Sequence, residues 1–334
     1  MSRIAVFVEN RPFFGALLVH VPLLHALRER HAGARLVLFA PFDAAGLLVR
    51  LGCADEAVRY DGRFADVSRR LRTLAPERLL VLRPASRWLD LAAAGSGARE
   101  RLGFDSWLAR LAYTRRAPHD TAIYRPRKYL TLLGGRAWAL AQPLDRWFRD
   151  VAAAAPTAHG AELAILPGGG AGAFKLWGSE HFIALAARLA ADDPALRFAW
   201  VLGPQEAALR VRIEASPVGA RSRCLVDRPV AELAALAFAA RGAVGNDCGP
   251  GHVFQMCGCP FACVMSDHDG GAAVRIAEWI DAPNREHAIR SAPGESIDRV
   301  PVEAVAERVR SLLAAPDRRG AGSQTTGAEP AKTV

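Results

Sequence analysis

Short apolar runs alternate with amphipathic stretches through the first half of the chain. An apolar run of four to eight residues between polar ones is typical of a strand buried in a parallel sheet. We expect such strands at residues 3–9, 35–40 and 77–84. Residues 16–30 have the pattern of a helix, with Pro22 near its first turn or at a kink. The alternation predicts an α/β domain whose parallel sheet is covered by helices on both faces.

A second series of the same kind begins near residue 161. We expect its strands at residues 161–170, 196–203, 223–226, 241–246 and 261–265. Helices fit the gaps at residues 179–191, which Ser179 can cap, and at residues 230–241. Two Rossmann-like α/β domains are therefore predicted. Their parallel sheets would face each other across a cleft, where ligands meet the carboxyl ends of the strands.

The domain boundary is expected where the apolar periodicity stops. Residues 150–162 are rich in Ala, Pro and Gly and read as the interdomain connection. We expect one domain over residues 1–152 and a second over residues 160–315. Residues 316–334 are polar and nearly free of large apolar side chains, which predicts a disordered tail.

The composition favours a soluble protein. The chain has 334 residues, of which 51% are hydrophobic, so it can bury two cores. It contains no run approaching about 18 uninterrupted apolar residues, and the N-terminus has no leader pattern, so we expect a cytoplasmic location. Six cysteines without a regular spacing fit reduced thiols better than a disulfide framework.

The charge of the chain is positive and partly concentrated. The formal net charge is +9, which favours acidic partners. Basic residues cluster between Arg101 and Lys128, mixed with aromatic side chains. They fit either a solvated arginine face or a surface that meets anionic lipid headgroups or a phosphorylated acceptor. No recognised nucleic-acid motif is present, so nucleic acid is not an expected partner.

A glycine-rich loop follows the predicted strand at residues 161–170. Gly168, Gly169 and Gly170 allow backbone N–H groups to approach a ligand closely, and Lys175 adds a positive charge at the end of the loop. The spacing is not that of a nucleotide-binding P-loop, so the glycines fit either an anion site or an ordinary loop.

The stretch "AVGNDCGPGHVFQMCGCP" (243–260) fits a strand, a tight turn and a short helix. Pro250 suits the first helical turn and Gly258 suits the helix end. Free N–H groups at such a helix start attract a diphosphate, and Asp247 can orient the turn or accept from a ligand hydroxyl. The donor-contact residues predicted here are Asp247, Cys248, Gly249, Pro250, Gly251 and His252.

The same stretch also allows two other interpretations. A metal site could use Cys248, His252, Cys257, Cys259 and Cys263, but their spacing matches no pair of the Cys-x-x-Cys type. A nucleophilic Cys248 beside His252 is also possible, although buried cysteine is usually inert. We expect no metal, and we attribute the Asp267-x-Asp269 pattern further on to chance.

These residues resemble those of glycosyltransferase family 9, the heptosyltransferase family of lipopolysaccharide assembly. The similarity rests on the glycine-rich loop followed by Lys175 and Trp177, and on Asn246, Asp247, Gly249 and His252 about seventy residues later. The first half agrees more loosely, through a strand, a loop with Gly15 and a following helix.

The resemblance implies a GT-B fold and a metal-independent, inverting transfer of a sugar. The donor would be a nucleotide sugar, usually an ADP-heptose, bound by the second domain without any cofactor. The acceptor would be a lipid-linked glycan of the lipopolysaccharide type, bound by the first domain. Contact with the inner face of the inner membrane through the basic residues 101–128 would follow, and Lys175 would stabilise charge on the leaving diphosphate.

The chain departs from the family pattern at two positions. Where the family has Gly-Asp after the first strand, this chain has Gly15 and Ala16, and alanine cannot accept a proton. A hydroxyl residue after Asp247 is replaced by Cys248, a weak hydrogen-bonding group. Glu9 is the candidate replacement base, or else the structural partner of a nearby arginine. The alternative function is a catalytically impaired homologue that acts as a nucleotide-binding or sugar-binding scaffold.

Overall fold

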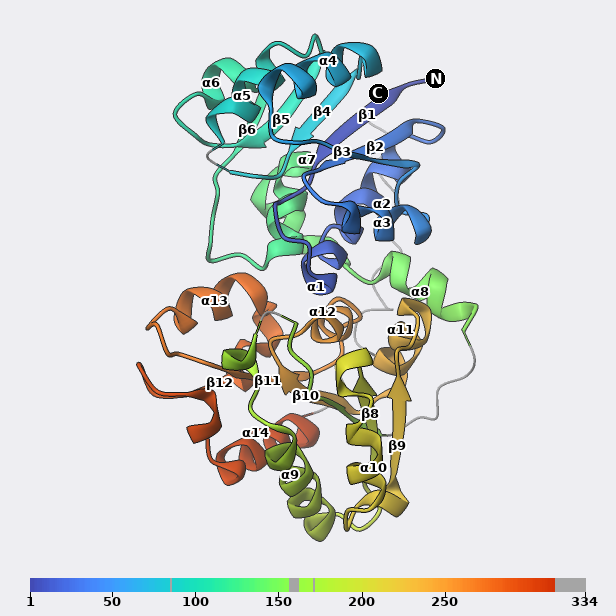
Figure 1. Cartoon of the computed structure of the whole chain (residues 1–334), viewed down its shortest axis with the longest axis vertical. Coiled ribbons are helices and arrows are strands. Elements are labelled where there is room, and N and C mark those ends of the chain that lie inside the picture. The colour runs from blue at the N-terminus through green and yellow to red at the C-terminus, as the bar shows by residue number, and fades with distance from the viewer. Residues whose placement is uncertain (85, 156–161, 171, 316–334) are drawn as a thin grey trace, which may run out of the picture.

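The fold consists of two α/β lobes, one above the other in Figure 1. The structure is a computed structural model that describes residues 1–84, 86–155, 162–170 and 172–315. The predicted tail at residues 316–334 and part of the predicted interdomain connection lie outside the described residues. Among the described helices, none combines the length and the apolar composition that a membrane crossing requires.

The first lobe is built on a six-stranded parallel sheet in the order β3-β2-β1-β4-β5-β6. Its strands are β1 (Arg3–Phe7), β2 (Arg35–Ala40), β3 (Glu56–Arg59), β4 (Arg78–Val81), β5 (Glu100–Phe104) and β6 (Arg115–Ala117). The helices are α1 (Phe14–Leu18), α2 (Val21–Arg30), α3 (Gly46–Arg50), α4 (Phe64–Leu74), α5 (Arg87–Ala94), α6 (Ala109–Ala112) and α7 (Arg125–Ala141), the last kinked at Gly135.

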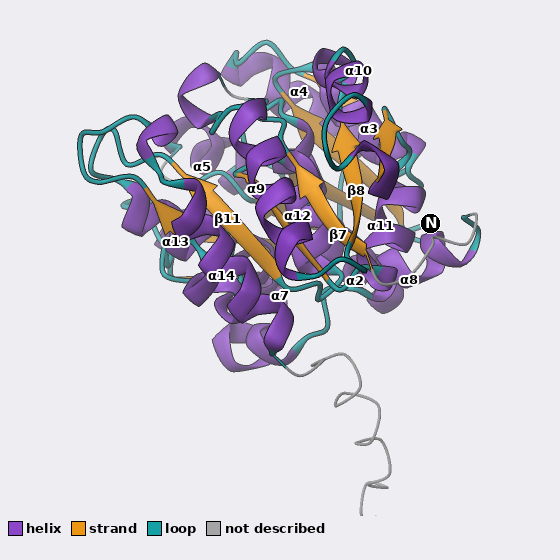
Figure 2. Ribbon diagram, turned by 90° about the horizontal axis from the view of Figure 1, so that it is seen from below, coloured by secondary structure: helices purple, strands orange, loops and turns teal. Residues whose placement is uncertain are grey.

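The second lobe repeats this plan with the order β12-β11-β10-β7-β8-β9. Figure 2 shows strands of this sheet among the helices that cover it. Its strands are β7 (Glu162–Leu166), β8 (Arg197–Leu202), β9 (Ser222–Val226), β10 (Gly242–Asn246), β11 (Phe261–Met265) and β12 (Ile289–Arg290). The α-helices are α9 (Ser179–Asp192), α10 (Leu209–Glu214), α11 (Val230–Ala239), α12 (Gly249–Met256), α13 (Ala272–Trp279) and α14 (Val302–Ala314), with short 3₁₀ turns between them, among them η5 (Ala282–His287). Helix α8 (Arg146–Ala153) joins the lobes.

Both sheets reverse their strand order at the centre, as in a doubly wound fold. In the first lobe the reversal lies between β1 and β4, and in the second it lies between β7 and β10. Ligands of such sheets bind in the crevice outside the carboxyl ends of the strands at the reversal. The prediction of two Rossmann-like domains is confirmed, and the reversal in the second lobe marks where a site is expected.

Most predicted elements are confirmed, with informative exceptions. The predicted helix at residues 16–30 is divided into α1 and α2, and Pro22 lies in the first turn of α2. Ser179 does not cap α9, because Gly178 holds the N-cap position and Ser179 is the first helical residue. The edge strands β3, β6 and β12 were not predicted, since they are short and partly exposed and lack the apolar runs of central strands. Strand β5 was also missed, because polar residues begin it.

Apolar packing continues from one lobe into the other. One face of the first sheet, with Ala5 and Phe7, belongs to a cluster confined to the first lobe. The opposite face, with Ile4 and Val6, belongs to a cluster that also contains Phe254 of α12. Because buried apolar area is the main favourable term in folding, this shared cluster holds the two lobes together.

Helix α8 bridges the lobes on one side of the molecule. Its Arg146 Nη1 lies 3.2 Å from Glu29 Oε1 on α2 of the first lobe. Its Arg149 guanidinium lies 4.9 Å from the ring centroid of Phe238 on α11 of the second lobe. The buried side chain of Phe148 fills the shared cluster. The helix therefore belongs to both lobes, although the sequence assigned it to the first domain.

Candidate active site

The candidate site lies where the loops after β7 and β10 meet. Asn246, the fully buried last residue of β10, joins these loops by hydrogen bonds. Its Nδ2 donates to the Pro167 carbonyl at 2.7 Å, and its Oδ1 accepts from the Trp177 amide at 3.1 Å. The buried Trp177 indole in turn donates to the Val300 carbonyl at 2.8 Å. The glycine-rich loop is thus attached to the turn that precedes α12.

Lys175 and Asp247 face each other from these two loops. The Lys175 ammonium forms an ion pair with Asp247 Oδ2. Lys175 lies in a short 3₁₀ turn after Gly172, whose φ of +130° is a conformation that L side chains rarely adopt. The glycine-rich loop, Lys175 and Asp247 converge in the structure, and they place one cation at the reversal point of the sheet.

Helix α12 starts directly beside this pair. Cys248 occupies the N-cap position, and its thiol, a weak hydrogen-bonding group, faces the backbone N–H of Gly251 in the first turn. Pro250 lies in the first turn, and Gly258, with a φ of +75°, follows the helix end, as predicted. A helix start that is capped only by a thiol still directs the positive end of its dipole at whatever lies in front of it.

His252 is a buried, neutral group that links the two lobes. Burial lowers the pKa of His252 to about 4, although the carboxylate of Asp247 acts in the opposite direction. Its Nδ1 lies 3.3 Å from the hydroxyl of Tyr124, which precedes α7 of the first lobe. Its Nε2 lies 3.9 Å from Asp247 Oδ1. The imidazole of His252 therefore links Tyr124 of the first lobe to the turn that contains Asp247.

The backbones of the two lobes touch at a pair of glycines. A Cβ atom added at Gly15 of α1 would lie 2.7 Å from the Gly249 Cα atom of α12 and 2.8 Å from the His252 ring. A Cβ atom added at Gly249 would lie 2.5 Å from the ring of Phe14. The close approach of α1 to the start of α12 therefore requires glycine at both positions.

Glu9, the predicted base, lies in a buried network of ion pairs. Its carboxylate pairs with Arg125, and the Arg125 guanidinium also lies 2.8 Å from Glu278 Oε1 on α13. Glu278 pairs in addition with the fully buried Lys128. Burial raises the pKa of Glu278, but the charge of Arg125 and the hydrogen bond from Lys128 outweigh burial, so the pKa lies below its usual value. The structure thus shows Glu9 as the structural partner of an arginine, whereas its role as a base stays a prediction.

The basic residues 101–128 do not form the single surface predicted from the sequence. Arg125 and Lys128 are buried, and Arg127 pairs with Asp281 of the second lobe at 3.0 Å. The Arg125 guanidinium also lies 4.2 Å from the ring centroid of Trp279. These three cations hold the lobes together and cannot reach a membrane, so the predicted surface is wrong for this part of the segment.

The cysteines fit a packing role. Burial raises the pKa of Cys248 to about 12 and raises those of Cys257 and Cys263 well above their usual range. A protonated thiol is a poor nucleophile, which disfavours thiol catalysis by Cys248. Within the described ranges, no group of three or more His, Cys, Asp or Glu residues could hold a metal ion. In the Asp267-x-Asp269 pattern, Asp267 pairs with Arg290 and Asp269 with Arg275.

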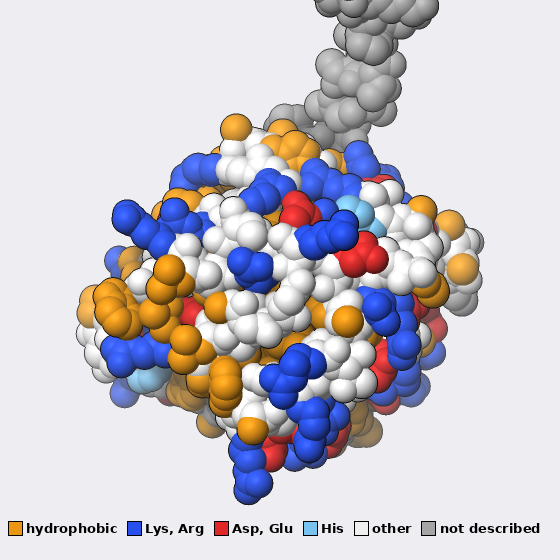
Figure 3. Space-filling view, turned by 90° about the horizontal axis from the view of Figure 1, so that it is seen from above, with side chains coloured by type: hydrophobic (Ala, Val, Ile, Leu, Met, Phe, Trp, Pro, Cys, Tyr) orange, Lys and Arg blue, Asp and Glu red, His pale blue; other side chains and the backbone are white. Residues whose placement is uncertain are grey.

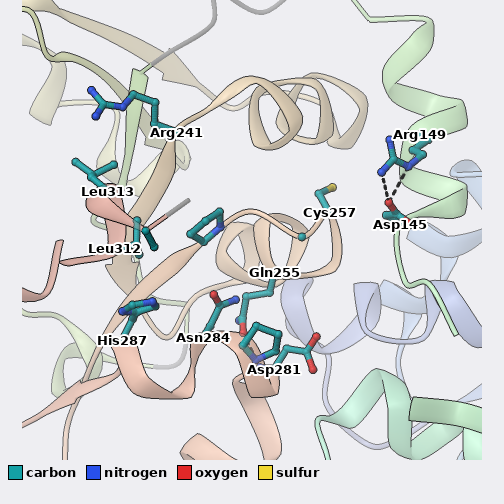
Figure 4. A pocket seen from close by; sticks show the side chains of 14 residues that line it. Asp145, Arg149, Arg241, Gln255, Cys257, Asp281, Asn284, His287, Leu312 and Leu313 are labelled. Carbon is teal, nitrogen blue, oxygen red and sulfur yellow. Dashed lines mark hydrogen bonds and ion pairs between the residues drawn. The ribbon is translucent and has the colours of Figure 1, made fainter. Parts of the chain in front are cut away.

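A cavity of the structure lies away from this site. It measures about 400 Å³ and opens at the other end of α12, among Asp145, Arg149, Cys257 and His287 (Figure 4). Near Lys175 and Asp247, a cavity of only about 10 Å³ reaches Phe174 and Ser266. The volume of a cavity therefore does not identify the site. The strand reversal and the converging loops identify it.

The loops after β7 and β10 lie in a region of the chain that matches a known protein family. Residues 136–264 match the family model "Glycosyltransferase family 9 (heptosyltransferase)". The match contains Lys175, Asp247 and α12, so the family resemblance predicted from the sequence is confirmed over this region. Comparison with curated proteins finds no match.

Solved structures of this family share the fold of the whole chain. The ADP-heptose lps heptosyltransferase II of E. coli is 19% identical, with a TM-score of 0.60 over 94% of this chain and 98% of its own. The E. coli heptosyltransferase WaaC with ADP is 18% identical, with a TM-score of 0.62 over 93% and 99%. A family 9 glycosyl transferase from Veillonella parvula is 16% identical, with a TM-score of 0.61 over 93% and 97%. The predicted GT-B fold is confirmed.

The structure also adds site residues that the sequence did not suggest. Tyr124, Glu278 and Trp279 surround His252 and Arg125 from both lobes. No local motif marks them, because Tyr124 and His252 are 128 positions apart and meet only when the lobes pack. The predicted roles of Gly168, Gly169, Gly170 and the start of α12 in donor binding stay predictions.

Proposed function

We propose that this glycosyltransferase moves a heptose-like sugar from a nucleoside diphosphate donor, ADP-linked, to a glycan acceptor of the lipopolysaccharide type. The observation that supports the proposal most directly is the convergence of the glycine-rich loop, Lys175, Asp247 and the start of α12 at the strand reversal. Backbone N–H groups and one cation at a helix start suit a diphosphate. The E. coli heptosyltransferase WaaC was solved with ADP and with ADP-2-deoxy-2-fluoro heptose, which supports the choice of ADP.

The proposed reaction is a direct, inverting displacement without metal or cofactor. The main demand on the protein is then to stabilise the charge that develops on the leaving diphosphate, and preorganised donors serve this purpose best. Lys175 is held at the site by Asp247, and a bound diphosphate would take over part of this ion pair. The start of α12 supplies further N–H donors from a rigid element.

The acceptor is proposed to bind from the side of the first lobe. A lipid-linked acceptor would bring the protein to the inner face of the inner membrane, on the cytoplasmic side. Its attacking hydroxyl must lose a proton, and Ala16 cannot take it. We retain Glu9 as the proposed base, since it lies near the start of the loop that leads from β1 toward α1 and is the acidic side chain that the sequence places there.

Two measurements test this proposal. The full chain is incubated with ADP-linked, UDP-linked and GDP-linked sugars and a lipopolysaccharide-type acceptor, and the released nucleoside diphosphate and glycosylated product are measured. Transfer from the ADP-linked sugar supports the proposal. Binding of the donor without any transfer across the panel would instead support the impaired homologue.

The base is tested by Glu9→Gln, with Arg11→Gln as a control because Arg11 lies 3.8 Å from the same carboxylate and is exposed. A general base contributes roughly 100-fold to 10,000-fold, so Glu9→Gln should lower turnover on this scale while donor affinity is unchanged. Near-normal turnover of Glu9→Gln would leave Glu9 with only the structural role that its pair with Arg125 shows.

A further inference from the structure

Three large apolar side chains stand in solvent at neighbouring positions of the first lobe. Trp107 is 84% exposed, Leu111 is 77% exposed and Leu91 is 52% exposed. Leu91 belongs to α5, while Trp107 and Leu111 lie in the turn that contains α6. We call these residues, together with the exposed Arg87 and Arg110, the α5–α6 patch. Seen from above, the first lobe shows hydrophobic side chains next to Lys and Arg side chains (Figure 3).

The α5–α6 patch is held as one rigid platform. Asp90, buried on α5, accepts a hydrogen bond at 2.7 Å from the hydroxyl of Ser106, the residue before Trp107. Asp90 also accepts from the hydroxyl of Tyr113, directly after α6. The buried Ala109 and Ala112 attach the inner side of α6 to the core. Trp107 and Leu111 are therefore presented outward by a fixed turn rather than by a loose loop.

The charges around these side chains are unbalanced. Among the described residues, neither Arg87 nor Arg110 has an ion-pair partner. The acidic neighbours are already engaged, since Asp90 accepts two hydroxyl groups and Asp105 pairs with Arg116 at 3.3 Å. Exposed apolar side chains next to unpaired cations are complementary to a surface that is apolar beneath and anionic outside.

We propose that the α5–α6 patch docks the protein on an anionic lipid surface. Trp107, Leu111 and Leu91 enter the boundary between headgroups and acyl chains, where tryptophan is favoured, and Arg87 and Arg110 contact headgroup phosphates. A stable protein interface uses about 20 to 30 residues a side, far more than this patch offers. The α5–α6 patch would then be the surface that brings the proposed enzyme to a lipid-linked acceptor. Only this link to the acceptor rests on the proposed function.

The test is cosedimentation of the full chain with vesicles, which needs no donor, acceptor or activity. Vesicles of phosphatidylcholine with about one third phosphatidylglycerol are compared with vesicles of phosphatidylcholine alone. Wild type should bind the anionic vesicles, and the double variant Trp107→Ser, Leu111→Ser should bind about tenfold or more weakly. Val211→Ser is the matched control, because Val211 is 71% exposed on α10 in the other lobe.

A second pair of variants separates local from overall charge. Arg87→Glu with Arg110→Glu should weaken binding by about tenfold, while Arg197→Glu, an exposed position in the second lobe, should leave it nearly unchanged. Melting temperatures check that each variant folds. If Arg197→Glu weakened vesicle binding as much as the Arg87 and Arg110 substitutions, the effect of charge would be non-specific. That result would overturn the assignment of the α5–α6 patch.

Two further results would also overturn the proposal. One is wild-type binding that survives the Trp107 and Leu111 substitutions. The other is an absence of vesicle binding together with a self-association that these substitutions abolish, which would make the α5–α6 patch a protein interface. Sugar transfer is measured in a separate assay, with an acceptor that is solubilised in detergent. Failure of the docking surface and failure of the proposed function can therefore be told apart.

Discussion

The carboxyl edges of the two sheets share one strand order but are used differently. At the second edge, the loops after β7 and β10 bring Lys175 and Asp247 together in front of α12. At the first edge, Glu9 turns inward to Arg125, which also reaches Glu278 in the other lobe. One edge therefore keeps its charges near the helix start, while the other uses them to join the lobes.

This difference shows how a repeated fold can divide its roles. The polar residues of the second edge are close in sequence to the strands that carry them, so a short motif describes them. Those of the first edge act through partners more than 100 positions away. The comparison predicts that substitutions at the second edge affect turnover. Apart from the proposed base Glu9, substitutions in the ion-pair network of Arg125, Lys128 and Glu278 should affect stability.

The largest effect expected at the second edge is on turnover. Lys175→Ala removes the cation that faces the proposed leaving group, and turnover should fall roughly 100-fold to 1,000-fold, as for loss of one transition-state donor. Steady-state kinetics with an ADP-linked sugar measure this. Lys175→Arg is the control, since it keeps the charge and should lose less. Wild-type turnover in Lys175→Ala would remove the proposed role of the second edge.

The next effect is on the stability of the buried ion-pair network that joins Glu9 of the first edge, through Arg125, to Glu278 of the second lobe. Glu278→Gln leaves the buried Lys128 without its acid, so the free energy of unfolding should fall by about 3 kcal/mol. Chemical denaturation measures this, and adding Lys128→Met should restore much of the loss. The exposed pair of Arg210 and Glu214 is the control, where Glu214→Gln should cost about 0.5 kcal/mol. Equal losses in the two variants would contradict a special role for the buried network.

A third effect is shared by both lobes and depends on pH. Burial lowers the pKa of His20 and of His252 to about 4, from about 6.5 when unfolded. The unfolded chain then binds more protons between these values, so stability should be complete above about pH 6.5 and be lost as the pH falls toward 4. Each histidine should cost about 2 kcal/mol by pH 5.

Denaturation at pH 7 and pH 5 measures this dependence. His252→Gln should make the stability less sensitive to pH, whereas His268→Gln, at an exposed histidine, should leave the sensitivity as it is. A wild-type stability that is flat between pH 7 and 5 would show that neither buried imidazole resists protonation.

The smallest effect concerns the start of α12. Cys248→Ser supplies an N-cap oxygen that can accept from the helix N–H groups, worth about 1 kcal/mol, so the melting temperature should rise by a few degrees. Cys263→Ser makes the same chemical change inside the buried strand β11, where an added hydroxyl should lower the melting temperature. A fall in both variants would show that the helix start is already satisfied by other groups.

The sequence predicts those strands and loops that are determined by residues close together in the chain. The central strands carry continuous apolar runs, and the loops at the second edge carry glycine, lysine and proline at positions with a direct backbone reason. The partners of Glu9 and His252 could not be predicted, because they depend on how two lobes pack. The burial of Arg125 and Lys128 was missed for the same reason, since a cluster of basic residues gives no sign of acidic partners on a distant helix.

Helix α8 decides how this protein can be divided. It ties Glu29 of the first lobe to Phe238 of the second, and Phe148 lies in the apolar cluster that both share. A fragment that began at residue 162 would leave the face of α11 that α8 covers open to water, and a fragment that ended before α8 would expose part of α2. Cutting the chain, or dividing its gene, between α8 and β7 should therefore give two halves that stay associated rather than two independent domains.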